Sequence, residues 1–551
     1  MRFCKSPVVF RTVSVALALL AAPVLPGAER AKKKAPAVEE AKKKAPAAKK
    51  GFLHLVPRDA LVVVAAPSLD GLESTLRTFA NQIPGADTEE LSELPMLFAM
   101  ALGRDSPPEG IDRKRPVGLA SDFSSMWFFF PIGDEEALKA WVGEAAAAHA
   151  ADGYLAVAQA GAYEIPKRSP FRSTLSGDLS ASLRLGTVVE RFGPMADLGL
   201  AQMREALSQN PAMKDSVFIL DAEIALLRAV AASIDQFDLA VKLDGANLEV
   251  SFRATPAKEG LAKRLVDAVA ASPVSGTGGL GALLPPGGMM EMELNVPPAI
   301  FGDLVDAVPW EKIGTAQAKK LGQALKTLVQ EQIRLIDGRM AVSYSFLDFA
   351  KMSVQGSTVN GLKDGPAYRE FLKTVYDRPE VKELMRAINL PEYSYKFRSD
   401  AFKLEGVPVD SFDQEFEMPA MPWLSPGDEK PSKTRIQGFS AVAGDLAIAT
   451  MGEGAKEALG PILRRKLADR KFDNMLSSMP ASDAFVRGAV DFAAFLRVFS
   501  KLASETGASA PEIPKDAKVV ITFEKAVRGG AAVGKVVFPV IPIVQLFQPA
   551  Y

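Results

Sequence analysis

Four segments of this sequence repeat the same order of signals, and this repetition limits the folds open to the chain. Three of them, Leu55–Leu76, Leu284–Val305 and Met479–Phe499, pass from a proline through a short apolar run and a polar break into an amphipathic stretch. Asp178–Phe192 follows the same order without the proline. A short apolar run bounded by turn residues is typical of a strand, and apolar residues three and four apart are typical of a helix. Each segment therefore predicts a strand followed by a helix that folds back on it.

A second kind of unit alternates with the first. Met126–Trp141 and Leu446–Leu459 each combine an apolar run, a glycine and an amphipathic stretch with acidic residues near its start. Acidic side chains are favourable near a helix N-terminus because they face the positive end of the helix dipole. We expect a buried strand and a helix in both segments, and Trp127–Phe130 (WFFF) reads as a strand buried on both faces rather than as the wall of an apolar pocket.

Turn dipeptides between alternating runs indicate β-hairpins. They are Asp244-Gly245, Gly444-Asp445 and Gly529-Gly530. Short hairpins join antiparallel neighbours, so the sheets are expected to be mainly antiparallel. Longer helices are expected over 88–102, 196–208, 213–234, 256–271, 314–335 and 364–388.

These elements predict an α+β protein of two diverged halves, each a mainly antiparallel sheet with helices packed on one face. The first half spans 51–275 and the second 282–551, with a Gly-rich linker at 276–281. Gly276, Gly278 and Gly281 have the spacing of a dinucleotide fingerprint, but that motif follows a strand and opens a helix. Here a helix precedes the glycines and Pro285-Pro286 follows, so a linker is predicted. The stretch Pro419–Ser432 reads as a surface loop.

The N-terminus has the pattern of a secretory signal peptide. Residues 1–28 combine three basic residues, a short apolar run at Thr12–Ala22 and small residues up to Ala28. The apolar run is shorter than a membrane span, which favours cleavage over retention as an anchor. The single cysteine, Cys4, precedes this run, so the mature chain is expected to contain neither disulfides nor reactive thiols.

Residues 29–50 form a low-complexity segment in which AKKKAPA occurs twice. Lysine, alanine and proline without larger apolar residues cannot form a core, so a disordered, basic tether is expected. The formal charge of −1 is a cancellation, because residues 1–50 are basic and the remaining chain is acidic. Only the tether is a candidate for binding an anionic surface, the alternative being a solubilising spacer. The lysines concerned are Lys32, Lys33, Lys34, Lys42, Lys43 and Lys44.

Candidate catalytic groups are few, because the chain has two histidines, His54 and His149. A Ser-His-Asp arrangement needs a histidine held by a carboxylate and facing a nucleophile, and neither has such a neighbour in the sequence. His149 is expected at the end of an Ala-rich helix. The residues favour a protein without catalytic activity, cofactor or metal.

The densest group of carboxylates is Asp410–Glu417. In a strand, Asp413, Glu415 and Glu417 share one face and two phenylalanines share the other. Two interpretations remain open: the solvated face of a half-buried strand, or a carboxylate site for hydrolysis or metal binding.

With its repeated proline–strand–helix units, opening LVPRDALVVVAAPSLDGL at Leu55 and including DLAIATMGEGAKEAL at Asp445, the chain resembles uncharacterised exported bacterial proteins. The resemblance spans Phe52 to Phe538 and implies an exported protein with the repeated architecture. It implies no catalytic residues.

The sequence therefore predicts an exported, non-catalytic binding or scaffold protein of the bacterial periplasm or cell surface. Its partner would be a protein, a cell-wall polymer or a lipid surface. Nucleic acid is not expected as a partner because the body is acidic, and no transmembrane span is expected in the mature chain. Two alternatives stay open: a carrier of a lipid or another apolar ligand, and a carboxylate-dependent hydrolase.

Overall fold

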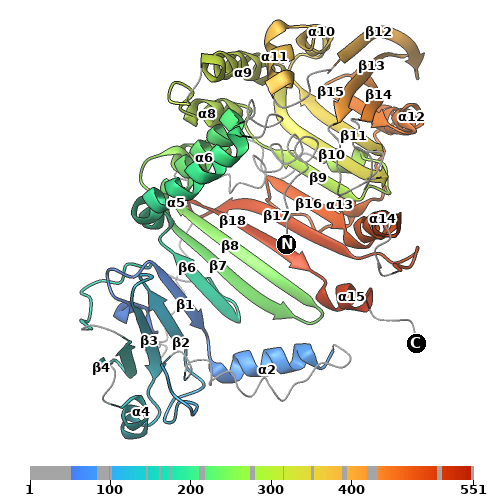
Figure 1. Ribbon diagram of the computed structural model, residues 1–551. Helices are drawn as coiled ribbons and strands as arrows, with labels where there is room; N and C mark the ends of the chain where they lie inside the picture. The colour runs from blue at the N-terminus through green and yellow to red at the C-terminus, as the bar shows by residue number, and fades with distance from the viewer. Residues whose placement is uncertain are drawn as a thin grey trace, which may run out of the picture.

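The computed structural model describes residues 51–82, 99, 102–143, 147–159, 163–172, 175–209, 217–272, 279–313, 316–348, 353–387, 394–418, 432–505 and 512–547. The signal peptide, the tether, most of the expected helix 88–102 and nearly all of the loop Pro419–Ser432 lie outside this range. Within it, the predicted α+β class and the mainly antiparallel sheet are confirmed (Figure 1).

The described strands pair in one unbroken order, and every pairing is antiparallel. From one edge to the other the strands are β4 (Ala147–Ala151), β5 (Tyr154–Ala158), β3 (Met126–Pro131), β2 (Val117–Ser121), β1 (Val62–Ala66), β6 (Leu179–Leu183), β7 (Ile234–Asp244), β8 (Asn247–Pro256), β18 (Ala531–Phe538), β17 (Val520–Arg528), β16 (Val486–Asp491), β9 (Met290–Asn295), β10 (Ile336–Asp348), β11 (Ser353–Leu362), β15 (Leu446–Gly452), β14 (Ser432–Ala443), β13 (Val407–Met418) and β12 (Ser394–Leu404).

The helices connect or cover these strands. They are η1 (Phe52–Leu55), α2 (Leu69–Ala80), α4 (Glu135–Val142), α5 (Leu185–Ser208), α6 (Val217–Ala232), α7 (Leu261–Ala270), η4 (Leu280–Leu283), α8 (Ala299–Ala307), α9 (Ala316–Leu335), α10 (Gly365–Val375), α11 (Pro379–Ala387), α12 (Ala455–Leu467), α13 (Met475–Ser478), α14 (Phe492–Glu505) and α15 (Val540–Gln545). The helix expected over 364–388 is divided, because Pro379 cannot continue the hydrogen bonding of α10 and instead begins α11.

The four repeated segments each form the predicted strand and helix, and each continues into a hairpin. The resulting units are β1–α2–β2–β3, β6–α5–α6–β7–β8, β9–α8–α9–β10–β11 and β16–α14–β17–β18. In every unit the first strand pairs with the second and the second with the third. The units therefore share one design, a strand and one or two described helices followed by an antiparallel hairpin.

These units meet through equivalent strands. The first strands pair across β1 and β6 and across β9 and β16, whereas the last strands pair across β8 and β18. The C-terminal unit thus lies between β8 of the first half and β9 of the second, as Figure 1 shows for β16, β17 and β18. The two halves predicted from the sequence are joined into a single hydrogen-bonded order by the last unit of the chain.

The predicted hairpins β7–β8, β14–β15 and β17–β18 are all present. In the last of them Arg528 pairs with Ala531, and Gly529 and Gly530 both have positive φ values, +59° and +75°. Two consecutive positive φ values define the tight turn whose twist matches that of the strands, and glycine adopts them without strain.

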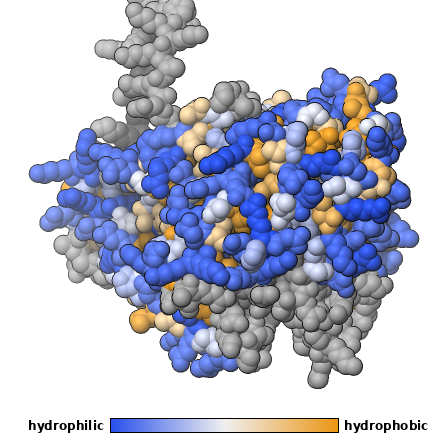
Figure 2. All heavy atoms as spheres, turned by 90° about the horizontal axis from the view of Figure 1, so that it is seen from above, coloured by the Kyte–Doolittle hydropathy of each residue, from blue (hydrophilic) through white to orange (hydrophobic). Residues whose placement is uncertain are grey.

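Two large apolar clusters lie on opposite faces of the central strands. One contains Met292 and Leu294 of β9 together with residues of α6, α7 and α8. The other contains Ala341 of β10 with residues of η4 and α12. Helices therefore cover both faces of this region, a detail that the sequence did not predict. On the face seen in Figure 2, hydrophilic residues dominate and apolar ones form small islands between them.

The aromatic run in β3 lies in the core, as predicted. Phe129 packs in one cluster with Phe52, and Phe128 and Phe130 pack in another on the opposite face. All three phenylalanines are at most 1% exposed. The strand is thus buried on both sides.

The expectation for His149 is wrong. The residue lies in the edge strand β4, not in a helix. The turn at Asp152-Gly153, with φ values of +50° and +77°, closes a hairpin in which β4 pairs with β5. This pairing overrides the helix propensity of the alanines, because propensity is weaker than tertiary context.

Aromatic side chains cover glycines on neighbouring strands at several points of the sheet. Phe252 is paired with Gly534, Phe523 with Gly488 and Phe412 with Gly438. A Cβ atom built on any of these glycines would lie 2.1–2.2 Å from the Cζ atom of the ring. The rings occupy the space that a side chain would need, an arrangement that fixes strand register.

Candidate docking surface

Helices α5 and α6 lie against each other and are joined by two ion pairs, whose α5 members Asp197 and Arg204 have side chains that are 58% and 50% exposed. Arg204 of α5 donates to Asp221 of α6 through its Nε atom at 2.9 Å, and Arg228 of α6 lies 2.5 Å from Asp197 of α5. Leu200 of α5, between these two ion pairs along the helix, is half-buried. The charged side of α5 is therefore used to hold α6.

The opposite side of α5 is apolar and open to solvent. Met195 is 67% exposed, Leu198 70% and Met203 41%. Residues that recur three and four apart share one face of a helix, and an apolar face of this kind normally packs on a core. Here Met195, Leu198 and Met203 are exposed to solvent, so α5 carries an apolar face that none of the described residues buries.

Neighbouring aromatic and apolar residues extend this surface. Phe123 is 57% exposed, and its ring meets that of Phe192 edge to face at 5.3 Å between centroids. Arg191 stacks over Phe192 at 5.5 Å, and Leu227 of α6 is 51% exposed. We call Phe123, Phe192, Met195, Leu198, Met203 and Leu227 the hairpin surface. Exposed apolar side chains gathered on neighbouring elements are candidates for an interaction site, because large exposed apolar patches mark such sites.

The sequence carries a signal for this surface in the spacing of residues along α5. Phe192, Met195, Gly199, Gln202 and Ala206 recur at alternating spacings of three and four. Such spacing predicts an apolar stripe, but it does not tell whether the stripe faces the core or the solvent. Only the ion pairs with α6 settle the orientation.

The histidines do not assemble a catalytic triad. His54 Nε2 lies 2.7 Å from Asp152 Oδ2, and His54 Nδ1 lies 2.7 Å from the carbonyl oxygen of Gly51. Both ring nitrogens are thus engaged, and neither is left to act on a nucleophile. The ring of His149 lies 6.1 Å from that of Tyr163. The His54–Asp152 pair could not be predicted from the sequence, because its members are 98 residues apart along the chain.

The acidic segment Asp410–Glu417 lies in β13, where its carboxylates hold other elements. Asp413 Oδ1 accepts from Nε and Nη2 of Arg435 on β14 at 3.1 and 3.0 Å. Glu415 is the cross-strand partner of the same Arg435 and is exposed. These contacts match a solvated, ion-paired strand face.

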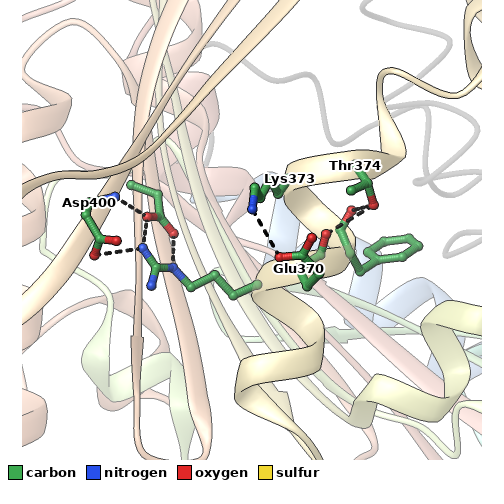
Figure 3. Close-up of polar contacts among 7 residues, drawn as sticks. Glu370, Lys373, Thr374 and Asp400 are labelled. Atoms are coloured by element: carbon green, nitrogen blue, oxygen red, sulfur yellow. Dashed lines mark hydrogen bonds and ion pairs between the residues drawn. The ribbon is translucent and has the colours of Figure 1, made fainter.

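Asp410 has a different role from its neighbours, because its side chain is only 4% exposed. It accepts from Arg369 of α10, at 2.6 Å for the Nε donor, and from the backbone amide of Asp400 at 2.9 Å. Figure 3 shows Asp400 on the strand side facing α10, the helix that carries Glu370, Lys373 and Thr374. Arg369 also reaches Asp400 at 3.0 Å, so this group ties α10 to the β12–β13 hairpin.

A pair of buried carboxylates in β9 was not anticipated. Glu291 and Glu293 are 0% and 1% exposed and lie on the same face of the strand. Glu293 Oε2 accepts from Nε and Nη2 of Arg487 at 3.2 and 3.1 Å, and Glu291 Oε2 accepts from the amide of Leu476 at 3.1 Å. Among the described residues, no group of three or more potential ligands could hold a metal ion here or elsewhere.

Burial raises the pKa of Glu291, and the amide of Leu476 and the charge of Lys518 offset this only in part. Because its pKa is raised in the folded protein, the protonated Glu291 contributes to the free energy of unfolding, and this contribution is fully present below the unfolded-state pKa. It is lost as the pH rises through the folded-state value.

From acidic to neutral pH, ionisation of Glu291 is expected to lower the free energy of unfolding of the parent chain. We expect the Glu291→Gln variant not to show this decrease. Glutamine keeps an acceptor for the Leu476 amide but cannot ionise. Urea unfolding over a pH series would measure the effect as a difference between the two proteins. A difference that does not change with pH would contradict it, and the ion-paired carboxylates elsewhere cancel in the comparison.

An open cavity of about 450 Å³ lies where α7 meets the ends of β7, β8 and the β17–β18 turn. Its lining includes Arg172, Asp235, Lys258 and Lys263. Arg172 and Lys263 already pair with Asp235 and Asp267. A charged and open lining does not suit a lipid or another apolar ligand.

None of the described helices has both the length and the apolar character needed to cross a membrane. No family model matches the sequence, and no curated protein matches it. Two solved structures, crystal forms I and III of TP0453, align with 8% and 7% identity. Each alignment covers 50% of this chain and 99% or 98% of the other chain, with a TM-score of 0.20. At that score the likeness carries no argument about fold or function.

Proposed function

We propose that this chain is an exported, non-catalytic binding or scaffold protein of the bacterial periplasm or cell surface. We further propose that it holds a macromolecular partner on the hairpin surface. The single observation that carries the second proposal is the exposed apolar face of α5, with Met195 and Leu198 two-thirds or more exposed while Asp197 and Arg204 pair with α6.

The energetic argument rests on apolar burial. Each large apolar side chain that passes from water into an interface contributes about 1.5–3 kcal/mol. While these residues are exposed to water, they contribute no burial energy to the stability of the monomer. They would contribute it when a partner covers the outer face of α5. Export is supported by the N-terminal signal pattern and by the resemblance to exported bacterial proteins with repeated units. The basic tether would add attraction to an anionic surface.

Site-specific photo-crosslinking in the producing bacterium tests the docking proposal. A photoreactive residue at position 198 is expected to give a defined cross-linked product. The same residue at position 139 of α4, where Lys139 is 53% exposed, is the matched control and is expected to give none. Equal products from both positions, or no product from position 198, would contradict a docking role for this surface.

Adding Met195→Asp to the position-198 protein is expected to remove the cross-link. Because Met195 is exposed, this change should alter the free energy of unfolding by no more than about 0.5 kcal/mol. Thermal unfolding of the purified variant checks that the fold is retained.

A further inference from the structure

The outer face of α5 has the residue spacing of a helix that pairs with another helix. Phe192, Met195, Gly199, Gln202 and Ala206 follow each other at intervals of three, four, three and four residues. This is the spacing of the core positions of a coiled coil, in which each side chain fits a space between residues of the facing helix. The ion pairs of Asp197 and Arg204 with α6 direct this seam away from the body.

We propose that the partner of the hairpin surface is a second copy of this chain, whose α5 lies antiparallel to the first across a two-fold axis near Asp197. The inference rests on the proposed function of the hairpin surface and assigns its occupant. A two-fold interface uses the same patch on both copies, so α5 must be complementary to itself.

In this arrangement a large residue meets a glycine on either side of the two-fold axis. Antiparallel pairing about Asp197 sets Met195 opposite the second copy's Gly199, and Phe192 opposite the second copy's Gln202. A Cβ atom on Gly199 would have no atom within 4 Å, so the space beside it is open. Each of the two methionines then enters the gap left by a glycine, which is the complementarity that packed helices require.

The charges beside the seam also match. Arg191 and Glu205 lie seven residues on either side of Leu198. Arg191 already lies 3.7 Å from Asp122 of its own chain. In the antiparallel arrangement its guanidinium also faces the second copy's Glu205, the reciprocal pair forms by symmetry, and Leu198 lies beside the second copy's Leu198. Flanking ion pairs of this kind set the orientation of paired helices. A parallel arrangement would place Arg191 beside the second copy's Ala196 and lose both pairs.

The seam covers the exposed half of one helix, which is a small interface. Contacts at or below about 1,200 Å² in total belong to weak or transient complexes. We expect a dissociation constant on the order of 10 μM, equivalent to a monomer–dimer equilibrium at ordinary laboratory concentrations.

Sedimentation velocity of the full chain between about 1 and 200 μM tests the proposal. The parent chain is expected to shift reversibly from monomer to dimer. Leu198→Glu places two like charges on the two-fold axis and is expected to weaken the dimer at least tenfold. Ala201→Glu changes an exposed residue on the flank of the same helix and is the matched control, with little change expected.

A charge exchange separates self-pairing from other modes of binding. Glu205→Arg alone sets Arg191 against an arginine of the second copy and is expected to weaken the dimer about tenfold. The chain that carries both Arg191→Glu and Glu205→Arg regains the pairs and is expected to regain most of the affinity. A partner other than a second copy would not be restored by this exchange.

A chain that stays monomeric at 200 μM overturns the inference, as does a dimer that is unaffected by both Leu198→Glu and Glu205→Arg. The photo-crosslink at position 198 then tests whether the proposed function holds without self-association. A product with a different protein leaves the proposed function in place without self-association. The absence of any product there removes the proposed function as well.

Discussion

Arg487→Met is expected to lower the free energy of unfolding by about 3–5 kcal/mol, because it leaves a buried carboxylate without its counter-charge. Arg487 of β16 is 12% exposed and makes two hydrogen bonds to Glu293 of β9, which is 1% exposed. These residues are cross-strand partners at the junction between the two units that β9 and β16 begin. Urea unfolding followed by circular dichroism measures the effect.

The double variant Arg487→Met with Glu293→Leu is the control. Replacing both members of a buried ion pair by apolar residues is often neutral or stabilising, because neither charge then has to be desolvated. The double variant is therefore expected to be markedly more stable than Arg487→Met alone. If the single and double variants unfold together, the loss comes from packing at position 487 rather than from the stranded carboxylate.

Gly488→Ala is expected to lower the free energy of unfolding by about 1–3 kcal/mol, although alanine is the smallest change available. The new Cβ atom would lie 2.2 Å from Cζ of Phe523 and 2.6 Å from Cε1, so the ring has to leave its place in the core. Phe523 packs against the cluster that joins the central strands to α6, α7 and α8. Thermal and urea unfolding would both report the loss.

The same substitution at Gly199 is the matched control and is expected to have the opposite sign. Gly199 lies in α5 with no atom within 4 Å of a built Cβ, and alanine in a helix is favoured over glycine by about 1 kcal/mol. Equal free energies of unfolding for the Gly488→Ala and Gly199→Ala proteins would contradict the prediction, because they would show that Phe523 can move aside without loss of stability.

Local patterns predicted the repeated units well. The apolar runs at Leu55, Asp178, Leu284 and Met479 each became a strand followed by a helix, and the three turn dipeptides each closed a hairpin. These features depend on contacts between residues that are close in sequence, so periodicity and turn chemistry determine them.

Such local patterns could not predict which units pair with each other. The contact of β8 with β18 joins residues more than 270 positions apart, and a strand pattern does not reveal which other strand will be its neighbour. Glu291 and Glu293 were hidden for a related reason, because alternation in MEMELN predicts a half-solvated strand unless a second layer, here α13, is known to cover the polar face.

The candidate site was predicted least well. The expected anionic-surface lysines lie outside the described residues, and the acidic segment of β13 proved to be ion-paired. The hairpin surface appeared only once the partners of Asp197 and Arg204 were known. A stripe of apolar residues has the same spacing whether it faces a core or a partner.

Because β16, β17 and β18 lie in the middle of the strand order, the sheet cannot be completed until these strands have been synthesised. A ribosome makes Val486–Phe538 after the other described strands, yet these strands separate β8 from β9. Until they emerge, each half carries an uncapped strand edge, and such edges are templates for aggregation. The nascent chain is therefore expected to expose the edges of β8 and β9 until β16, β17 and β18 are made. A chaperone that binds the nascent chain would have to cover these two edges until β18 pairs with β8 and β16 pairs with β9.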